Sequence, residues 1–88
     1  MEQVGQIEFL IDKDIFSLSE EERTKVLKEE FEKHSYIPTD EPVVVREGKI
    51  SSVRAVEKDT QEEVELYVFA KVIKKGDTLK TYISAKVV

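Results

Sequence analysis

The chain has 88 residues, 40% of them hydrophobic and 38% charged, and a formal net charge of −5. This length fits a single domain, 1–88, and the recurring apolar residues are typical of a folded chain rather than a disordered one. The absence of cysteine excludes disulfides, thiolate nucleophiles and cysteine-based zinc or iron–sulfur sites.

The charge is divided unevenly along the chain. Residues 1–66 hold 9 Lys and Arg against 18 Asp and Glu, a net charge of −9, whereas residues 67–88 hold 5 Lys against 1 Asp, a net charge of +4. The overall negative charge disfavours binding to nucleic acid or to an anionic membrane. The basic C-terminal segment leaves a local exception open.

No segment is typical of a targeting signal or a membrane span. The apolar run at 7–11 contains Glu8 and stops at Asp12, so it is too short for either, and we expect a cytoplasmic protein. Asn, Cys and Trp are absent while Glu and Lys are abundant, a composition found in thermophilic proteins and also in designed ones.

The first predicted element is a strand at residues 3–12, where apolar and polar residues alternate. Ile7, Phe9 and Ile11 share one face of this strand. Leu10 interrupts the opposite, polar face, which suggests that this face is partly covered.

A helix follows. The segment Ser17–Glu22 contains two overlapping capping boxes and three glutamates that suit the positive end of a helix dipole, and the helix is expected to run to about Ser35. Its apolar stripe is narrow, which indicates a single packing partner, a sheet face. The stripe consists of Val26, Leu27 and Phe31.

The middle of the chain predicts a short strand at Val43–Val45. The next segment, Arg46–Lys49, predicts a tight turn, because Gly48 accommodates a positive φ. That turn would pair Val45 with Ile50. The alternative is one long strand with a bulge at the glycine.

Three strands complete the chain, at residues 50–57, 63–73 and 78–88, and Lys75-Gly76 predicts a two-residue turn between the last two. With that turn, one face of the hairpin pairs apolar residues throughout. These pairs are Val64 with Val87, Leu66 with Ala85, Val68 with Ile83, and Val72 with Leu79. A shift by one residue would break both faces.

The predicted fold is α+β, in the order β-α-β-β-β-β, with one helix packed on one face of an antiparallel meander sheet of four to five strands. We expect the helix to cover Leu66, Val68, Leu79 and Ile83. This layout resembles the cystatin-like arrangement. The chain has no Gln-Val-Val-Ala-Gly-type inhibitory loop, and the nearest stretch, Ser52–Val56, does not supply one, so the resemblance implies the layout and no protease-inhibitor function.

No residue pattern is typical of catalysis or of a metal site. The single histidine, His34, lies near the end of the predicted helix, where it suits the helix dipole. Asp12-Lys13-Asp14 lacks the ligand number and the glycine of an EF-hand loop. The glycines form no phosphate-binding loop, and nothing marks a pair of carboxylates as buried in a cleft. We expect no catalytic residue, metal, cofactor or small-molecule ligand, and therefore no enzyme.

The second face of the C-terminal hairpin is the feature that stands out. A solvent-facing antiparallel face is usually polar, so three aromatic residues there need an explanation. Three interpretations stay open, namely cover by the chain itself, for example by residues 36–42, an interface with a protein, and a platform for single-stranded nucleic acid. The residues of this candidate surface are Tyr67, Phe69, Lys71, Ile73, Lys80 and Tyr82.

From this surface we expect a small non-enzymatic interaction module that binds a protein partner, or a second copy of itself as a homodimer. One alternative is the binding of single-stranded nucleic acid on the same face, which the net charge of −5 disfavours. Another is an acidic inhibitor or regulator of another protein that acts through the glutamate-rich helix. No membrane partner is expected.

Overall fold

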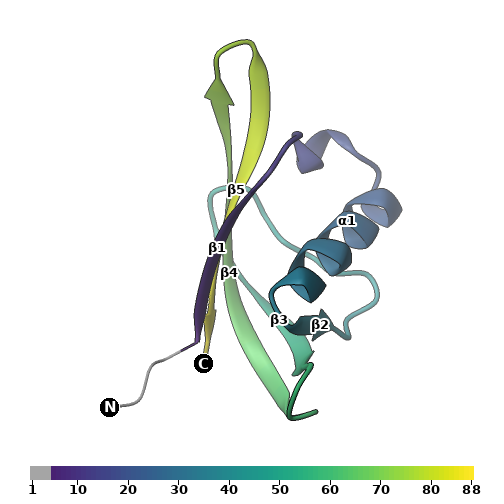
Figure 1. Cartoon of the computed structure of the whole chain (residues 1–88). Coiled ribbons are helices and arrows are strands. Elements are labelled where there is room, and N and C mark those ends of the chain that lie inside the picture. The colour runs from purple at the N-terminus through teal and green to yellow at the C-terminus, as the bar shows by residue number, and fades with distance from the viewer. Residues whose placement is uncertain (1–4) are drawn as a thin grey trace.

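The computed structural model describes residues 5–88 and shows one helix packed on a five-stranded antiparallel sheet (Figure 1). The strand order is β1-β5-β4-β3-β2. The predicted α+β fold is confirmed, whereas residues 3 and 4 of the first predicted strand lie outside the described residues. The elements are β1 (Gln6–Ile11), the 3-10 helix η1 (Ile15–Ser17), α1 (Glu20–Lys33), β2 (Tyr36–Pro38), β3 (Ile50–Glu57), β4 (Glu63–Lys75) and β5 (Thr78–Val87).

Helix α1 begins at the second of the two predicted caps. Ser19 is its N-cap, and the Ser19 hydroxyl accepts a hydrogen bond from the backbone N–H of Glu22 at 3.2 Å, which satisfies an amide that a helix start leaves unpaired. Ser17, the other predicted cap, lies in η1 instead. The helix ends at Lys33, and Ser35 then adopts a left-handed conformation, φ 73°, before β2 begins. Within residues 5–88, no helix is long and apolar enough to cross a membrane.

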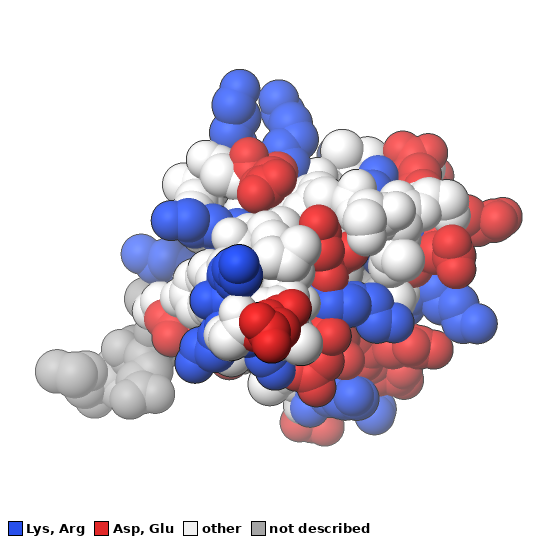
Figure 2. All heavy atoms as spheres, turned by 90° about the horizontal axis from the view of Figure 1, so that it is seen from above, with Lys and Arg blue, Asp and Glu red and all other residues white. Residues whose placement is uncertain are grey.

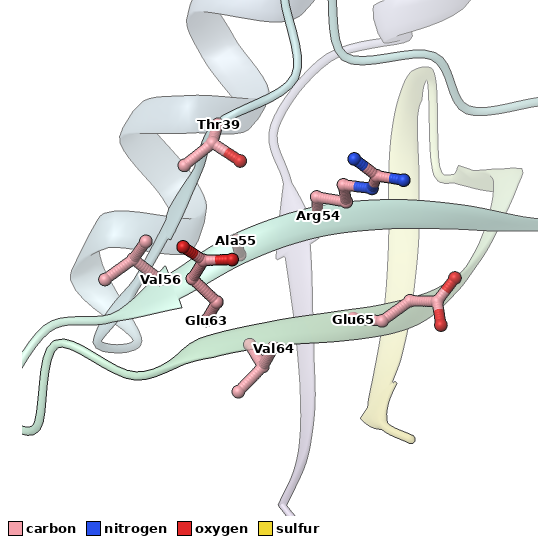
Figure 3. A pocket seen from close by; sticks show the side chains of 7 residues that line it. All are labelled: Thr39, Arg54, Ala55, Val56, Glu63, Val64 and Glu65. Atoms are coloured by element: carbon pink, nitrogen blue, oxygen red, sulfur yellow. The ribbon is translucent and has the colours of Figure 1, made fainter.

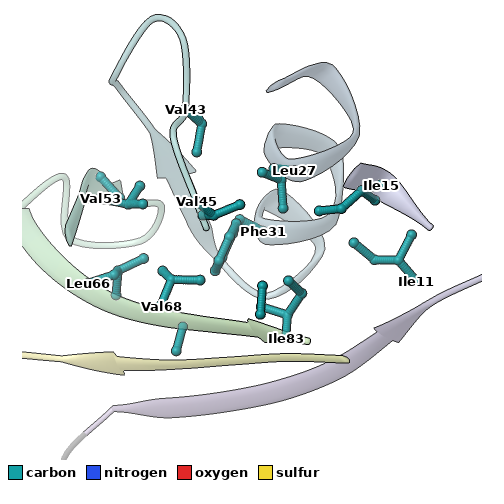
Figure 4. Close-up of a cluster of buried hydrophobic side chains, with 13 residues drawn as sticks. Ile11, Ile15, Leu27, Phe31, Val43, Val45, Val53, Leu66, Val68 and Ile83 are labelled. Atoms are coloured by element: carbon teal, nitrogen blue, oxygen red, sulfur yellow. The ribbon is translucent and has the colours of Figure 1, made fainter. Parts of the chain in front are cut away.

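The core lies between α1 and the inner face of the sheet, which is the face that α1 covers (Figure 4). Leu27 and Phe31 of the helix are fully buried, while Val26 packs at the margin. Burial of side chains of this size stabilises a fold by roughly 1.5–3 kcal/mol each. The sheet and connecting segments contribute Ile11, Ile15, Val43, Val45, Val53, Ala55, Leu66, Val68, Ala70, Ile83 and Ala85.

The segment between β2 and β3 corrects one prediction. Val43–Val45 is a loop rather than a strand, although Val43 and Val45 are buried and Val44 is exposed. The backbone N–H of Val43 donates to Thr24 Oγ1 on α1 at 3.1 Å, so the helix, and not a neighbouring strand, supplies its partner. The strand that precedes β3 is β2, which pairs with β3 antiparallel.

The predicted turn at Arg46–Lys49 is present but does not join two paired strands. Gly48 has the positive φ expected of it, 75°, and its N–H donates to the carbonyl oxygen of Ala70 at 2.7 Å. This bond ties the turn to the edge of β4. As a result, Ile50 pairs with Phe69 rather than with the valine run.

The C-terminal hairpin corrects a second prediction. Its turn is Gly76-Asp77, not Lys75-Gly76, so the pairing differs from the predicted register by two residues. Val68, for example, lies opposite Ala85 rather than Ile83. Because side chains alternate with a period of two, a shift of two residues leaves every side chain on its predicted face.

β4 and β5 extend beyond the other strands as a two-stranded arm (Figure 1). β1 accompanies β5 only as far as Thr81, and β3 accompanies β4 only as far as Phe69. Residues 74–79 at the end of the arm are all exposed. The prediction that the helix covers Leu79 is therefore wrong, since this side chain lies on the arm and is 46% exposed.

Candidate interaction surface

The outer face is the side of the sheet opposite α1, and alternate side chains of β4 and β5 lie on it. These side chains adjoin across the hairpin, because Lys71 lies opposite Tyr82 and Ile73 opposite Lys80. The change of register altered these pairs without separating the residues. The structure thus brings together on one face all the residues of the predicted surface, Tyr67, Phe69, Lys71, Ile73, Lys80 and Tyr82.

The members of this surface differ in exposure. Tyr67 is the most exposed of its aromatic residues, at 46%, and Lys71 is also exposed, while the others are partly buried. Figure 1 places α1 and η1 on the inner side of the sheet, and no described helix lies over the outer face. The segment considered as a cover, 36–42, begins instead with β2 at the edge of the sheet.

Two apolar residues that the sequence did not assign to this surface extend it. Leu10 lies opposite Tyr82 and is 42% exposed, and Ile50 lies opposite Phe69 and is 66% exposed. Leu10 could have been found from the sequence, because it interrupts the polar face of its strand. Ile50 was not found, because the predicted turn paired it with Val45. We name the apolar and aromatic members of this enlarged set the outer apolar surface, consisting of Leu10, Ile50, Tyr67, Phe69, Ile73 and Tyr82.

A shallow hollow of about 420 Å³ lies on this surface where β1 meets the arm. Its lining residues are Glu8, Phe9, Leu10, Ile73, Lys75 and Tyr82. A small-molecule site needs convergent polar groups to orient its ligand, and this hollow is mostly apolar. It is better suited to receive an apolar side chain of a protein.

One lysine of the surface already has an ionic partner. Lys80 Nζ lies 2.7 Å from Asp12 Oδ1. The hydrogen bond from Lys80, and secondly its positive charge, lowers the pKa of the Asp12 carboxyl below its usual value of 3.8. Lys71 has no ion pair among the described residues, so its charge is available to a partner.

The uneven charge along the sequence corresponds to an uneven charge in space. In Figure 2, Asp and Glu are frequent on the side of α1, whereas Lys and Arg border the opposite side. Among the residues that adjoin the outer apolar surface, lysines such as Lys71, Lys80 and Lys86 outnumber the glutamates, which are Glu8 and Glu65. A partner with acidic groups around an apolar centre would be electrostatically complementary to it.

Other candidate sites in the described part of the chain give weaker indications of a function. A hollow of about 500 Å³ beside β3 and β4 contains Arg54, Glu63 and Glu65 in its lining (Figure 3). All three are exposed, in contrast to the buried carboxyl of an acid catalyst. Among all the described residues, no group of three or more side chains could hold a metal ion. His34 stacks on Phe9 with ring centroids 4.8 Å apart, so packing accounts for it.

No protein-family model, curated protein or solved structure matches this chain. No relative therefore contributes an activity, a ligand or a partner. The outer apolar surface, with Lys71 beside it, is the feature from which a function can be inferred.

Proposed function

We propose that this chain is a non-enzymatic interaction module that binds a protein through its outer apolar surface. The observation that carries this proposal is the contiguity of the surface. Its residues come from β1, β5, β4 and β3, which are consecutive neighbours in the sheet. Single exposed apolar residues are ordinary on proteins, whereas a contiguous apolar patch is typical of an interaction site.

The composition of the surface also supports a protein partner. Aromatic residues are enriched at the centre of protein interfaces, and charged residues lie at the rim. Here Phe69 and Tyr82 are central and partly buried, while Lys71 and Glu8 are exposed beside them. We expect the two aromatic side chains to contribute most of the binding energy, as large anchors do in other interfaces.

Site-specific photo-crosslinking in cells that make the protein tests this proposal. A photoreactive residue at position Tyr67 on the outer face is compared with one at Glu29 on α1. We expect a discrete adduct from the first position and none from the second, and we expect the adduct to disappear when Phe69→Glu is added. An adduct with twice the mass of the chain would identify the partner as a second copy.

The controls separate loss of binding from loss of folding. Thermal melts followed by circular dichroism must show that the chain with Phe69→Glu is folded; Tyr82→Lys replaces it if it is not. Equal adducts from the two positions, or none from Tyr67, would contradict a binding role for the outer face.

Single-stranded nucleic acid is a second candidate ligand, favoured by one pair on the same face. Tyr67 lies opposite Lys86, so a base that stacks on the ring would place its phosphate near an ammonium group. Anisotropy with a labelled oligonucleotide tests it. Binding that weakens with salt and is lost in Lys71→Glu with Lys86→Glu would favour this function, and absence of binding at low salt would exclude it.

A further inference from the structure

The free edges of the sheet differ in how they are protected from pairing with another strand. The edge at β2 is three residues long and ends in Pro38, and the free sides of the arm carry lysines such as Lys71 and Lys75. Short strands, prolines and lysines are common means by which proteins prevent edge-to-edge pairing. β1, Gln6–Ile11, has none of them, and its one charge is Glu8.

The hydrogen-bond pattern shows which backbone groups of β1 face this open edge. The N–H of Val87 in β5 donates to the carbonyl oxygen of Gly5 at 2.8 Å. In an antiparallel pair every second residue is bonded to the neighbouring strand, so the odd-numbered residues of β1 are bonded to β5. The even-numbered residues Gln6, Glu8 and Leu10 therefore point their N–H and C=O groups away from the sheet.

We propose that β1 pairs antiparallel with β1 of a second copy, which joins the two sheets into one across a two-fold axis. A two-fold interface requires a surface that is complementary to itself, and a free antiparallel edge meets this requirement. The α1 helices of both copies then lie on the same side, and the two outer apolar surfaces meet along the seam. This inference depends on the edge of the sheet and not on the function proposed above.

An axis at Glu8 or at Phe9 overlaps most of β1, and charge decides between these two registers. If the axis passes through Glu8, two carboxylates lie directly opposite each other, which is unfavourable. If it passes through Phe9, each Glu8 lies opposite Leu10 of the second copy and exchanges backbone hydrogen bonds with it. The two Phe9 side chains then adjoin on the inner face, each held by an edge-on contact with Phe31 of its own copy, with ring centroids 5.5 Å apart.

A pair of variants at one position tests the pairing by size-exclusion chromatography with light scattering. Glu8→Pro and Glu8→Thr both remove the charge, but only proline removes the N–H at the open edge. Since this N–H is not bonded to β5, an edge strand tolerates proline there. We expect the wild type and Glu8→Thr at twice the chain mass of 10.2 kDa, and Glu8→Pro at the single mass.

Amide hydrogen exchange of the unmodified chain provides a measurement that needs no variant to fold. The amides of Glu8 and Leu10 should exchange at least about tenfold more slowly in concentrated than in dilute protein, because pairing buries them. The amide of Phe9, which is bonded to β5 in each copy, is the internal control. We expect its exchange to change much less on dilution.

Several outcomes would overturn the proposal. A wild-type monomer at millimolar concentration would do so, as would a dimer that survives Glu8→Pro. A dimer lost in Phe69→Glu but not in Glu8→Pro would assign self-association to the outer face instead. Protection of the Glu8 and Leu10 amides only after another protein is added would assign the edge to a foreign strand. An edge dimer should persist in Phe69→Glu even if the crosslinks from the outer face are lost, which separates the two proposals.

Discussion

The two faces of the sheet are built by the same alternating strands but have different surroundings. On the inner face, Leu66, Val68 and Ile83 are fully buried beside α1. On the outer face, Tyr67 and Ile50 remain exposed. Both faces carry apolar residues, so hydrophobicity alone does not show which face forms the core. The position of the helix decides this.

The helix can cover only one face, because its apolar stripe is narrow. Thr24, Leu27 and Phe31 are its buried residues, and its first turn is acidic. The inner face forms the core, and we expect substitutions on the outer face to leave that core intact. This contrast can be tested by comparing substitutions on the two sides.

The largest effect is expected on the inner face, for Phe31→Ala. Removal of this fully buried ring should lower the free energy of unfolding by about 3–5 kcal/mol, through lost transfer energy and the cavity that remains. Urea denaturation measures it. A loss below about 1 kcal/mol would mean that the helix contributes little to the core.

The next effect concerns a polar side chain of the inner face. Thr81 is fully buried, and its hydroxyl accepts from the N–H of Ile15 at 3.1 Å and donates to the carbonyl oxygen of Lys13 at 2.7 Å. Thr81→Val keeps the shape but leaves these groups unpaired, so we expect a loss of about 1–3 kcal/mol. Denaturation of Thr78→Val, at the exposed end of the arm, is the control, and equal losses in both variants would contradict the prediction.

A smaller effect is expected on the outer face, for Tyr67→Ser. Because the ring is 46% exposed, the free energy of unfolding should fall by no more than about 1 kcal/mol. Partner crosslinking from a photoreactive residue at Lys71, on the same face of β4, should decrease nonetheless. A melting temperature lowered as much as in Phe31→Ala would show that this face also belongs to the core.

The smallest effect is expected at the Lys80–Asp12 pair, and it depends on pH. Since Lys80 lowers the pKa of Asp12, the pair stabilises the fold above the usual carboxyl pKa and stops doing so as the pH falls through the lowered one. Thermal melts should therefore show Lys80→Met slightly less stable than wild type near neutral pH, and the difference should disappear as the pH falls below the lowered pKa of Asp12. Lys86→Met, which removes a lysine without an ion pair among the described residues, should show no such dependence. A difference for Lys80→Met that persists in acid would contradict the ionic explanation.

The face of the sheet on which each side chain of the hairpin lies could be predicted from the sequence, whereas the register of the strand pairing could not. Alternation placed Tyr67 and Phe69 on the face opposite Leu66 and Val68, as observed. The same alternation is unchanged by a shift of two residues, so only the turn could decide the register. Gly76, with φ 61°, is the first rather than the second residue of that turn, a detail that the apolar pattern does not contain.

The edge strand β2 and the full extent of the outer apolar surface were not predicted, for a different reason. Val43–Val45 is as apolar as a strand, but the partner of the Val43 N–H is Thr24 of α1, a tertiary contact that no local pattern reveals. Once Ile50 had been paired with this run, it could not be placed beside Phe69. The residues of the predicted surface lie on one face, as alternation implied, but Leu10 and Ile50, which share that face, were left out. The role of this face in binding stays a prediction.

The order of the strands also has a consequence for how the chain folds. β1 is the first strand, yet its neighbour is β5, the last, with pairs from Gln6↔Lys86 to Ile11↔Thr81. Contacts between segments so distant in sequence slow folding, because the entropy of closing the intervening chain is lost before the contacts form. During synthesis, the backbone of β1 has no strand to pair with until residues 78–87 have left the ribosome, although Phe9 can already pack against Phe31 of α1.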